Sequence, residues 1–138
     1  MPKLALTDTE IDAMARYVAA TGGRPDEPVA VPDVNTFPQA KVDAGKNTFV
    51  LVCAQCHSLG TVVQTPLASQ QGPDLIHVAG RVDWDWARRW ITNPQAIDPK
   101  TKMLIPTALS SDDVDNVRMF VWKTSLEAKT VSTANTGG

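Results

Sequence analysis

The sequence is poor in cysteine, in basic charge and in long apolar runs. Its 138 residues include two cysteines and two histidines, and the formal net charge is −2. A chain without a basic excess is not expected to bind nucleic acid. No apolar run reaches the roughly 18 residues of a membrane-spanning helix, and the start at Met1–Lys3 lacks a signal-peptide pattern. Both cysteines fall in one short segment, so no framework of disulfides is available to the fold.

That segment, Cys53–His57, reads Cys-Ala-Gln-Cys-His. Cys-x-x-Cys-His is the attachment signature of a c-type haem. Two thiols at this spacing lie on one face of a helical turn, so both can add to the vinyl groups of one porphyrin. The imidazole of His57 then serves as the proximal ligand of the iron. The motif predicts one haem c, bound covalently through Cys53 and Cys56, and a role in one-electron transfer.

Other interpretations of the two cysteines are weaker. A structural zinc site needs four ligands, and His77 is the one remaining strong candidate. Adjacent Cys56 and His57 would also have difficulty reaching one tetrahedral ion together. A thioredoxin-like pair is expected in a βαβ setting, whereas the flanking residues have a helical pattern. A structural disulfide at this spacing would be strained.

The hydrophobic pattern predicts an all-α protein, because no segment alternates as a strand does. Helices are expected at residues 7–21, 39–54, 84–93 and 110–128, with loops at 60–72 and 94–106. On the third helix, Arg88 and Arg89 are expected to pair with Asp85 on a solvated face. Pro94 is expected to end that helix, since the residue before proline avoids the α region.

The chain divides into a helical domain and additional segments. We expect a helical appendage at residues 1–22, a Pro-rich linker at 23–38, the main domain at 39–128 and a flexible tail at 129–138.

The first and last helices begin alike. Thr7 and Glu10 form a predicted capping box, and Ser110 and Asp113 form a second one at an offset of 103 residues. Residues around and after the boxes also correspond: Leu6 with Leu109, Asp12 with Asp115, Tyr17 with Phe120 and Val18 with Val121. Two interpretations remain open. The helices share good capping and nothing more, or residues 1–20 are the last helix of a preceding, similar domain, with the linker at its boundary.

With these parts in order, residues 40–126 resemble the class I cytochromes c, and among them the cytochrome c domains of respiratory complexes such as haem–copper oxidases. The matching residues are Ala44-Gly45 and Phe49 before the motif, Gly72-Pro73-Asp74-Leu75 with His77 and Arg81 after it, then Trp90–Gln95, Lys102-Met103 and the last helix. One departure is that Leu104 and Ile105 precede Pro106, where the family has Pro directly after the methionine.

The resemblance implies a cytochrome c fold around one haem, with an extra N-terminal helix and linker. It also implies roles for individual residues. The carbonyl of Pro73 would accept the second ring N–H of His57. Arg81 and the indole N–H of Trp90 or Trp86 are candidates to bind the haem propionates.

In the family the first and last helices of the domain cross closely, with a small residue on one and an aromatic residue on the other. Here Gly45 would meet Phe120 or Trp122.

A six-coordinate haem needs a sixth ligand, and a thioether stabilises Fe(II). Met1 is terminal, whereas Met14 and Met119 lie on apolar helical stripes. Met103 lies in a loop between prolines, and the resemblance puts the axial methionine there. The predicted iron ligands are His57 and Met103. The alternatives are that His77 is the sixth ligand or that the sixth position is empty.

The sequence therefore predicts an electron-transfer protein and not an enzyme, either a carrier or a subunit of a respiratory complex. Its partners would be redox proteins. Because haem is attached covalently outside the cytoplasm, we expect a periplasmic or extracytoplasmic location. The alternative is a c-type haem enzyme or gas-binding sensor, which requires an open or labile distal site.

Overall fold

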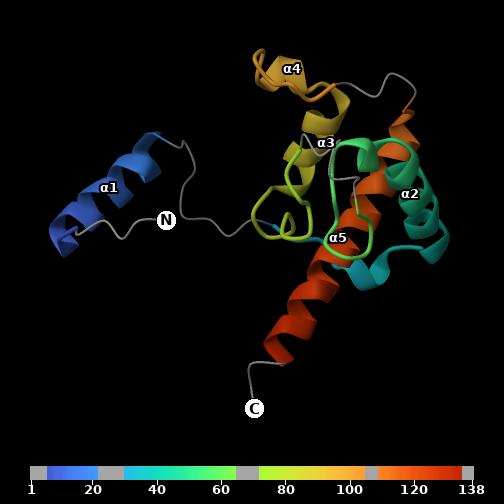
Figure 1. Ribbon diagram of the computed structural model, residues 1–138, viewed down its shortest axis with the longest axis horizontal. Helices are drawn as coiled ribbons and strands as arrows, with labels where there is room; N and C mark the ends of the chain where they lie inside the picture. Colours follow the sequence, from blue (N-terminus) through green and yellow to red (C-terminus); the bar gives the residue numbers. More distant parts are fainter. Residues whose placement is uncertain (1–5, 22–29, 65–71, 105–108, 135–138) are drawn as a thin grey trace.

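The computed structural model describes residues 6–21, 30–64, 72–104 and 109–134 (Figure 1). Its elements are α1 (Asp8–Thr21), the 3₁₀ helix η1 (Val34–Thr36), α2 (Gln39–Leu51), the 3₁₀ helix η2 (Cys53–Gln55), α3 (Trp84–Thr92), α4 (Pro94–Ile97) and α5 (Ser111–Ala134). These ranges hold no strand, only the isolated bridges Leu59–Val63 and Ala79–Val82. The predicted all-α class is confirmed for the described residues. None of their helices combines the length and apolar character that a bilayer crossing requires.

Three helix boundaries differ from the sequence prediction. Helix α2 ends at Leu51, before the cysteines, because β-branched residues near its end favour helix weakly. Pro94 does end α3, but it also begins α4, where Asn93 accepts a hydrogen bond from the backbone of Ala96. Helix α5 continues to Ala134, so the predicted tail begins with helix.

The core lies where α2 crosses α5 (Figure 1). Gly45 is buried at the crossing, and a Cβ there would collide with the backbone carbonyl of Asn116. One turn further, Phe49 is fully buried and meets Phe120 edge-on, with ring centroids 5.7 Å apart. The crossing is present, and the atoms nearest to a Cβ at Gly45 belong to the α5 backbone at Asn116 and Val117, not to Phe120 or Trp122. The aromatic contact belongs to Phe49 instead.

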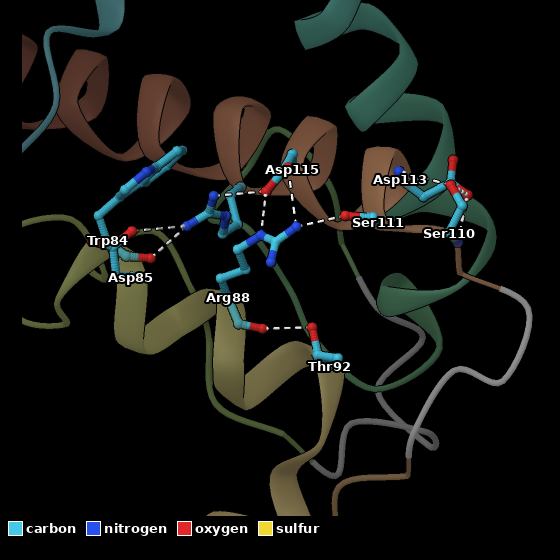
Figure 2. A network of polar contacts seen from close by, with 9 residues as sticks. Trp84, Asp85, Arg88, Thr92, Ser110, Ser111, Asp113 and Asp115 are labelled. Carbon is cyan, nitrogen blue, oxygen red and sulfur yellow. Dashed lines mark hydrogen bonds and ion pairs between the residues drawn. The ribbon is translucent and has the colours of Figure 1, made fainter.

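Helix α3 is held on α5 by a group of charged side chains (Figure 2). The carboxylate of Asp115 accepts hydrogen bonds from Arg88 of α3, at 3.0 Å, and from Arg118 of α5, at 2.7 Å. Arg118 is 5 % exposed. It also donates to the carbonyl oxygen of Trp84 at 2.7 Å and lies over its ring, 4.0 Å from the centroid.

These contacts correct the pairing predicted for Arg88. Its guanidinium binds Asp115 and the hydroxyl of Ser111 on α5, not Asp85 on its own helix. Asp85 instead lies 3.9 Å from Arg118. Arg88 reaches α5 because α3 packs directly against it, a contact that helical spacing alone does not reveal.

The predicted linker is partly packed against the domain. Residues 22–29 lie outside the described ranges, but Val34 and Phe37 pack on the core. Phe37 stacks on Trp84 with centroids 5.6 Å apart, and Trp84 meets Trp122 edge-on at 5.2 Å. The packed part of the chain therefore begins several residues before residue 39.

Helix α1 stands apart from the other helices in Figure 1. Its predicted capping box is present, since the Glu10 carboxylate accepts from the Thr7 amide at 2.8 Å and the Thr7 hydroxyl accepts from the Glu10 amide at 3.4 Å. Its apolar side chains are exposed, Ile11 to 51 % and Met14 to 53 %. Good capping thus forms this helix without covering its apolar face.

Candidate haem site

The two cysteines lie in and beside the 3₁₀ turn that follows α2. The amides of Cys56 and His57 both donate to the carbonyl of Cys53, at 3.0 and 2.8 Å. These bonds bring the whole motif into one compact turn. Both thiols are free and half-buried.

Burial, with a smaller contribution from Cys56, raises the pKa of the Cys53 thiol to about 11. At neutral pH this thiol is protonated. The reactive cysteine of a thioredoxin-like pair has a lowered pKa and is largely a thiolate. The environment of Cys53 therefore does not fit a dithiol redox catalyst.

His57 is oriented by one hydrogen bond. Its Nδ1 lies 2.8 Å from the carbonyl oxygen of Pro73. A carbonyl oxygen only accepts, so Nδ1 carries a proton, and the neutral ring in this tautomer has its lone pair on Nε2. An imidazole held in this tautomer by a backbone carbonyl has the arrangement of a metal-ligating histidine.

Pro73 reaches His57 because the segment after residue 71 runs along the motif. The amide of Gly72 donates to the carbonyl of Cys56 at 3.0 Å, and the amide of Leu75 donates to that of Ser58 at 2.9 Å. At Gly72 a Cβ would collide with the imidazole of His57. Only glycine lets the backbone come this close to the ring.

The carboxylate of Asp74 connects the same two segments. It accepts from the amide of Gly60 at 3.0 Å and from that of Ile76 at 2.9 Å. Gly60 has a positive φ of 55°, which turns its N–H toward Asp74. The Gly-Pro-Asp-Leu segment is therefore held at both sides of the proline that binds His57.

Met103 is held through its backbone. The side-chain amide of Gln95 donates to the Met103 carbonyl at 2.7 Å, and the Met103 amide donates to the hydroxyl of Thr101 at 3.2 Å. Gln95 stands in α4, whose first residue, Pro94, is buried. Met103 is half-buried, whereas the next side chain, Leu104, is 82 % exposed. The residues from Ile105 to Pro106 lie outside the described ranges.

The other predicted haem contacts are placed as follows. Trp90 and Trp86 are half-buried and stack on each other, with centroids 5.1 Å apart and planes 14° apart. Arg81 is exposed, and its guanidinium makes no hydrogen bond or ion pair with the described residues. His77 is also exposed.

Three buried polar atoms lack a partner among the described residues and were not anticipated from the sequence: Trp122 Nε1, Gln95 Oε1 and Arg118 Nε. A buried donor such as Trp122 N–H costs stability unless something accepts it. The short helix that positions Gln95 has a signal in the sequence, because Asn93 can cap a helix and proline is favoured at its first position. For Trp122 the family resemblance indicates the helix crossing but not the environment of the indole N–H, which depends on packing such as the contact with Trp84.

The donors present fit a haem better than a zinc ion. Among the described residues no group of three or more His, Cys, Asp or Glu side chains could hold a metal. An iron porphyrin needs only axial donors from the protein, together with two thiols for attachment. His57 with a free Nε2, a half-buried Met103 and two free thiols meet that need.

No family model matches this chain, and no curated protein matches it either.

Proposed function

We propose that this protein is a monohaem electron-transfer protein with a cytochrome c fold. Cys53 and Cys56 would hold one haem c through thioether bonds, and His57 and Met103 would be the axial ligands. When bound, the haem supplies a one-electron Fe(III)/Fe(II) couple. The observation that carries the proposal is the Cys-x-x-Cys-His turn whose histidine donates through Nδ1 to the Pro73 carbonyl, 2.8 Å away.

The residues of the chain would serve this redox couple by keeping the two axial ligands in fixed positions. Pro73 and Gly72 restrict the ring of His57 to one orientation, and Gln95 and Thr101 hold the backbone of Met103 from both sides. Ligands that do not move between the two redox states keep the reorganisation on electron transfer small. A tethered Met103 favours a closed distal side, and thus a carrier over a haem enzyme or a gas sensor. Covalent attachment implies maturation outside the cytoplasm, with redox proteins as partners.

The first test is attachment. The chain should be produced in a bacterial periplasm with the haem-attachment machinery, and haem staining should follow a denaturing gel. We expect one haem per chain that survives denaturation, and loss of the covalent signal when both cysteines are changed to serine. A chain that matures without any covalent haem would exclude the proposal.

The second test concerns the sixth ligand. The oxidised holoprotein should show the weak far-red band of a sulfur–iron bond, and Met103→Ala should abolish it and lower the reduction potential. Leu104→Ala is a matched control because the neighbouring side chain is exposed. A high-spin spectrum and rapid ligand binding in the unaltered protein would favour the enzyme or sensor alternative. Retention of the band in Met103→Ala would exclude Met103.

A further inference from the structure

The exposed apolar face of α1 corresponds in sequence to a face of α5 that is buried in the core. Val114, Val117 and Phe120 of α5 correspond to Ile11, Met14 and Tyr17 of α1 at the same offset of 103 residues. In α5 these three side chains are 4, 2 and 4 % exposed. In α1, Ile11 and Met14 are 51 and 53 % exposed. Positions that are buried in α5 are thus exposed in α1 at Ile11 and Met14.

The two helices also begin with the same capping geometry, so their residues can be compared position by position from the cap onward. Ser110 and Asp113 form a reciprocal pair, with the Ser110 amide 3.0 Å from the Asp113 carboxylate and the Asp113 amide 3.1 Å from the Ser110 hydroxyl. Thr7 and Glu10 form the same pair in α1. Since both helices start at the equivalent residue, their apolar faces point in the same direction relative to the cap.

The partner of the α5 face is α2, and its chemistry is specific. Gly45 lets the α5 backbone approach at Asn116, and Phe49, four residues later, packs against Phe120 at 5.7 Å. In α1 the position of Asn116 is taken by Ala13, a small residue that also allows a close approach. A helix with glycine and, four residues on, an aromatic residue is therefore the complement of this face.

Charge supports the same partner. Asp115 of α5 accepts from Arg118 on its own helix and from Arg88 on α3. Asp12 is the corresponding residue of α1, and its Oδ2 accepts from Arg16 on its own helix at 2.8 Å. An arginine from a second domain could bind Asp12 as Arg88 binds Asp115.

We propose that α1 docks through Ile11, Met14 and Tyr17 onto an α2-type helix of a second domain, in the way that α5 docks onto α2. The α2 helix within the same domain is not available, because α5 already covers Phe49, which is 0 % exposed. This docking depends on helix packing and not on bound haem, so it stands or falls separately from the proposed electron transfer.

The test adds a second α2-type helix to the full chain. A second copy of residues 38–52 is joined to the N-terminus through a flexible Gly/Ser linker, which makes the contact intramolecular. We expect amide hydrogen exchange in α1 to slow by about tenfold or more. The matched control carries Gly45→Leu in the added copy alone, where the larger side chain blocks the close approach, and its α1 should exchange as in the unmodified chain.

Three results would overturn the docking. The first is unchanged exchange in α1 with the added helix. The second is equal slowing with the Gly45→Leu copy, which would show non-specific apolar contact. The third is a concentration-dependent increase in mass of the unmodified chain that Met14→Glu removes, because the face would then be occupied by a second copy of α1.

Discussion

His57 and Gly72 show how single residues determine the chemistry of the site. The imidazole is useful as a ligand only in one tautomer and one orientation, and both depend on the Pro73 carbonyl 2.8 Å from Nδ1. That carbonyl comes within reach because Gly72 has no side chain to meet the ring. The orientation of His57 therefore depends on Gly72, although the two residues are far apart in the sequence.

Replacing Gly72 with valine tests this dependence. The added atoms would collide with the imidazole, so we expect the His57–Pro73 hydrogen bond to be lost and the yield of low-spin holoprotein to fall severalfold. Nitrogen NMR of the His57 ring and the visible spectrum measure the two effects. Thr61→Val, at an exposed position of the preceding loop, should change neither. A Gly72→Val protein with an unaltered ring signal would show that the glycine is dispensable.

At the scale of elements, two contacts determine where the helices lie. The crossing of α2 and α5 depends on backbone approach at Gly45, and the placement of α3 on α5 depends on the Asp115 carboxylate between Arg88 and Arg118. The second contact matters for the site because α3 is followed directly by α4, and Gln95 of α4 binds the backbone carbonyl of Met103. Figure 2 shows Arg88 of α3 and Asp115 of α5 meeting between the two helices.

Gly45→Leu should separate α2 from α5. The larger side chain meets the Asn116 carbonyl and not a flexible neighbour, so we expect a loss of about 3 kcal/mol or more in the free energy of unfolding and little stable holoprotein. Chemical denaturation and haem retention measure the loss. Ala44→Leu is the matched control, since the adjacent residue on the same helix is exposed. Normal melting of the Gly45→Leu protein would contradict the close crossing.

Asp115 should make the fold sensitive to acid. Burial opposes its ionisation, but hydrogen bonds from Arg88 and Arg118 outweigh this and hold the pKa of Asp115 below its ordinary value. A carboxyl with a lowered pKa in the folded state stabilises the fold above its unfolded pKa, which is about 3.9. This contribution is lost as the pH falls from there through the folded value.

Asp115→Asn should therefore cost about 1–3 kcal/mol near neutral pH, because Arg118 loses its charged partner while buried. It should also flatten the fall in stability below about pH 4. Urea denaturation at a series of pH values measures both effects. Asp112→Asn, at an exposed position of the same helical turn, should leave both unchanged. An equally steep acid dependence in Asp115→Asn would show that other groups dominate.

At the scale of the whole molecule, the described residues form one hydrophobic core and a helix, α1, that stands apart from it in Figure 1. The described core draws on α2, α3, α5 and the segments between them, and Val34 and Phe37 extend it toward the N-terminus. None of the described side chains of α1 belongs to that core. The docking proposal accordingly gives α1 a role outside the stability of the core.

Deleting residues 1–21 should accordingly leave the domain intact. Because the apolar side chains of α1 such as Ile11 and Met14 are exposed, we expect the melting temperature to change by less than about 2 °C. Differential scanning calorimetry of the two chains measures this. Deleting residues 30–37 in addition is the contrasting variant, since it removes the Phe37–Trp84 stacking and should lower the melting temperature. A large loss from the first deletion alone would mean that α1 packs on the domain.

Much of the local structure follows from the sequence alone. The sequence predicts the capping boxes at Thr7 and Ser110 and the all-α class, and all three are present in the described residues. These signals act within one or two helical turns, so a short stretch of sequence contains all of their atoms. For the same reason, the Cys-Ala-Gln-Cys-His segment identifies its candidate chemistry without any knowledge of the fold.

The tertiary structure decided which distant groups meet. It brought Pro73 to His57, gave Met103 its support from Gln95, and paired Arg88 with Asp115 and not with Asp85. It also left the face of α1 open while burying the same pattern in α5. Each outcome depends on how helices pack, because packing sets distances between residues that are far apart along the chain, and local propensities carry no information about those distances.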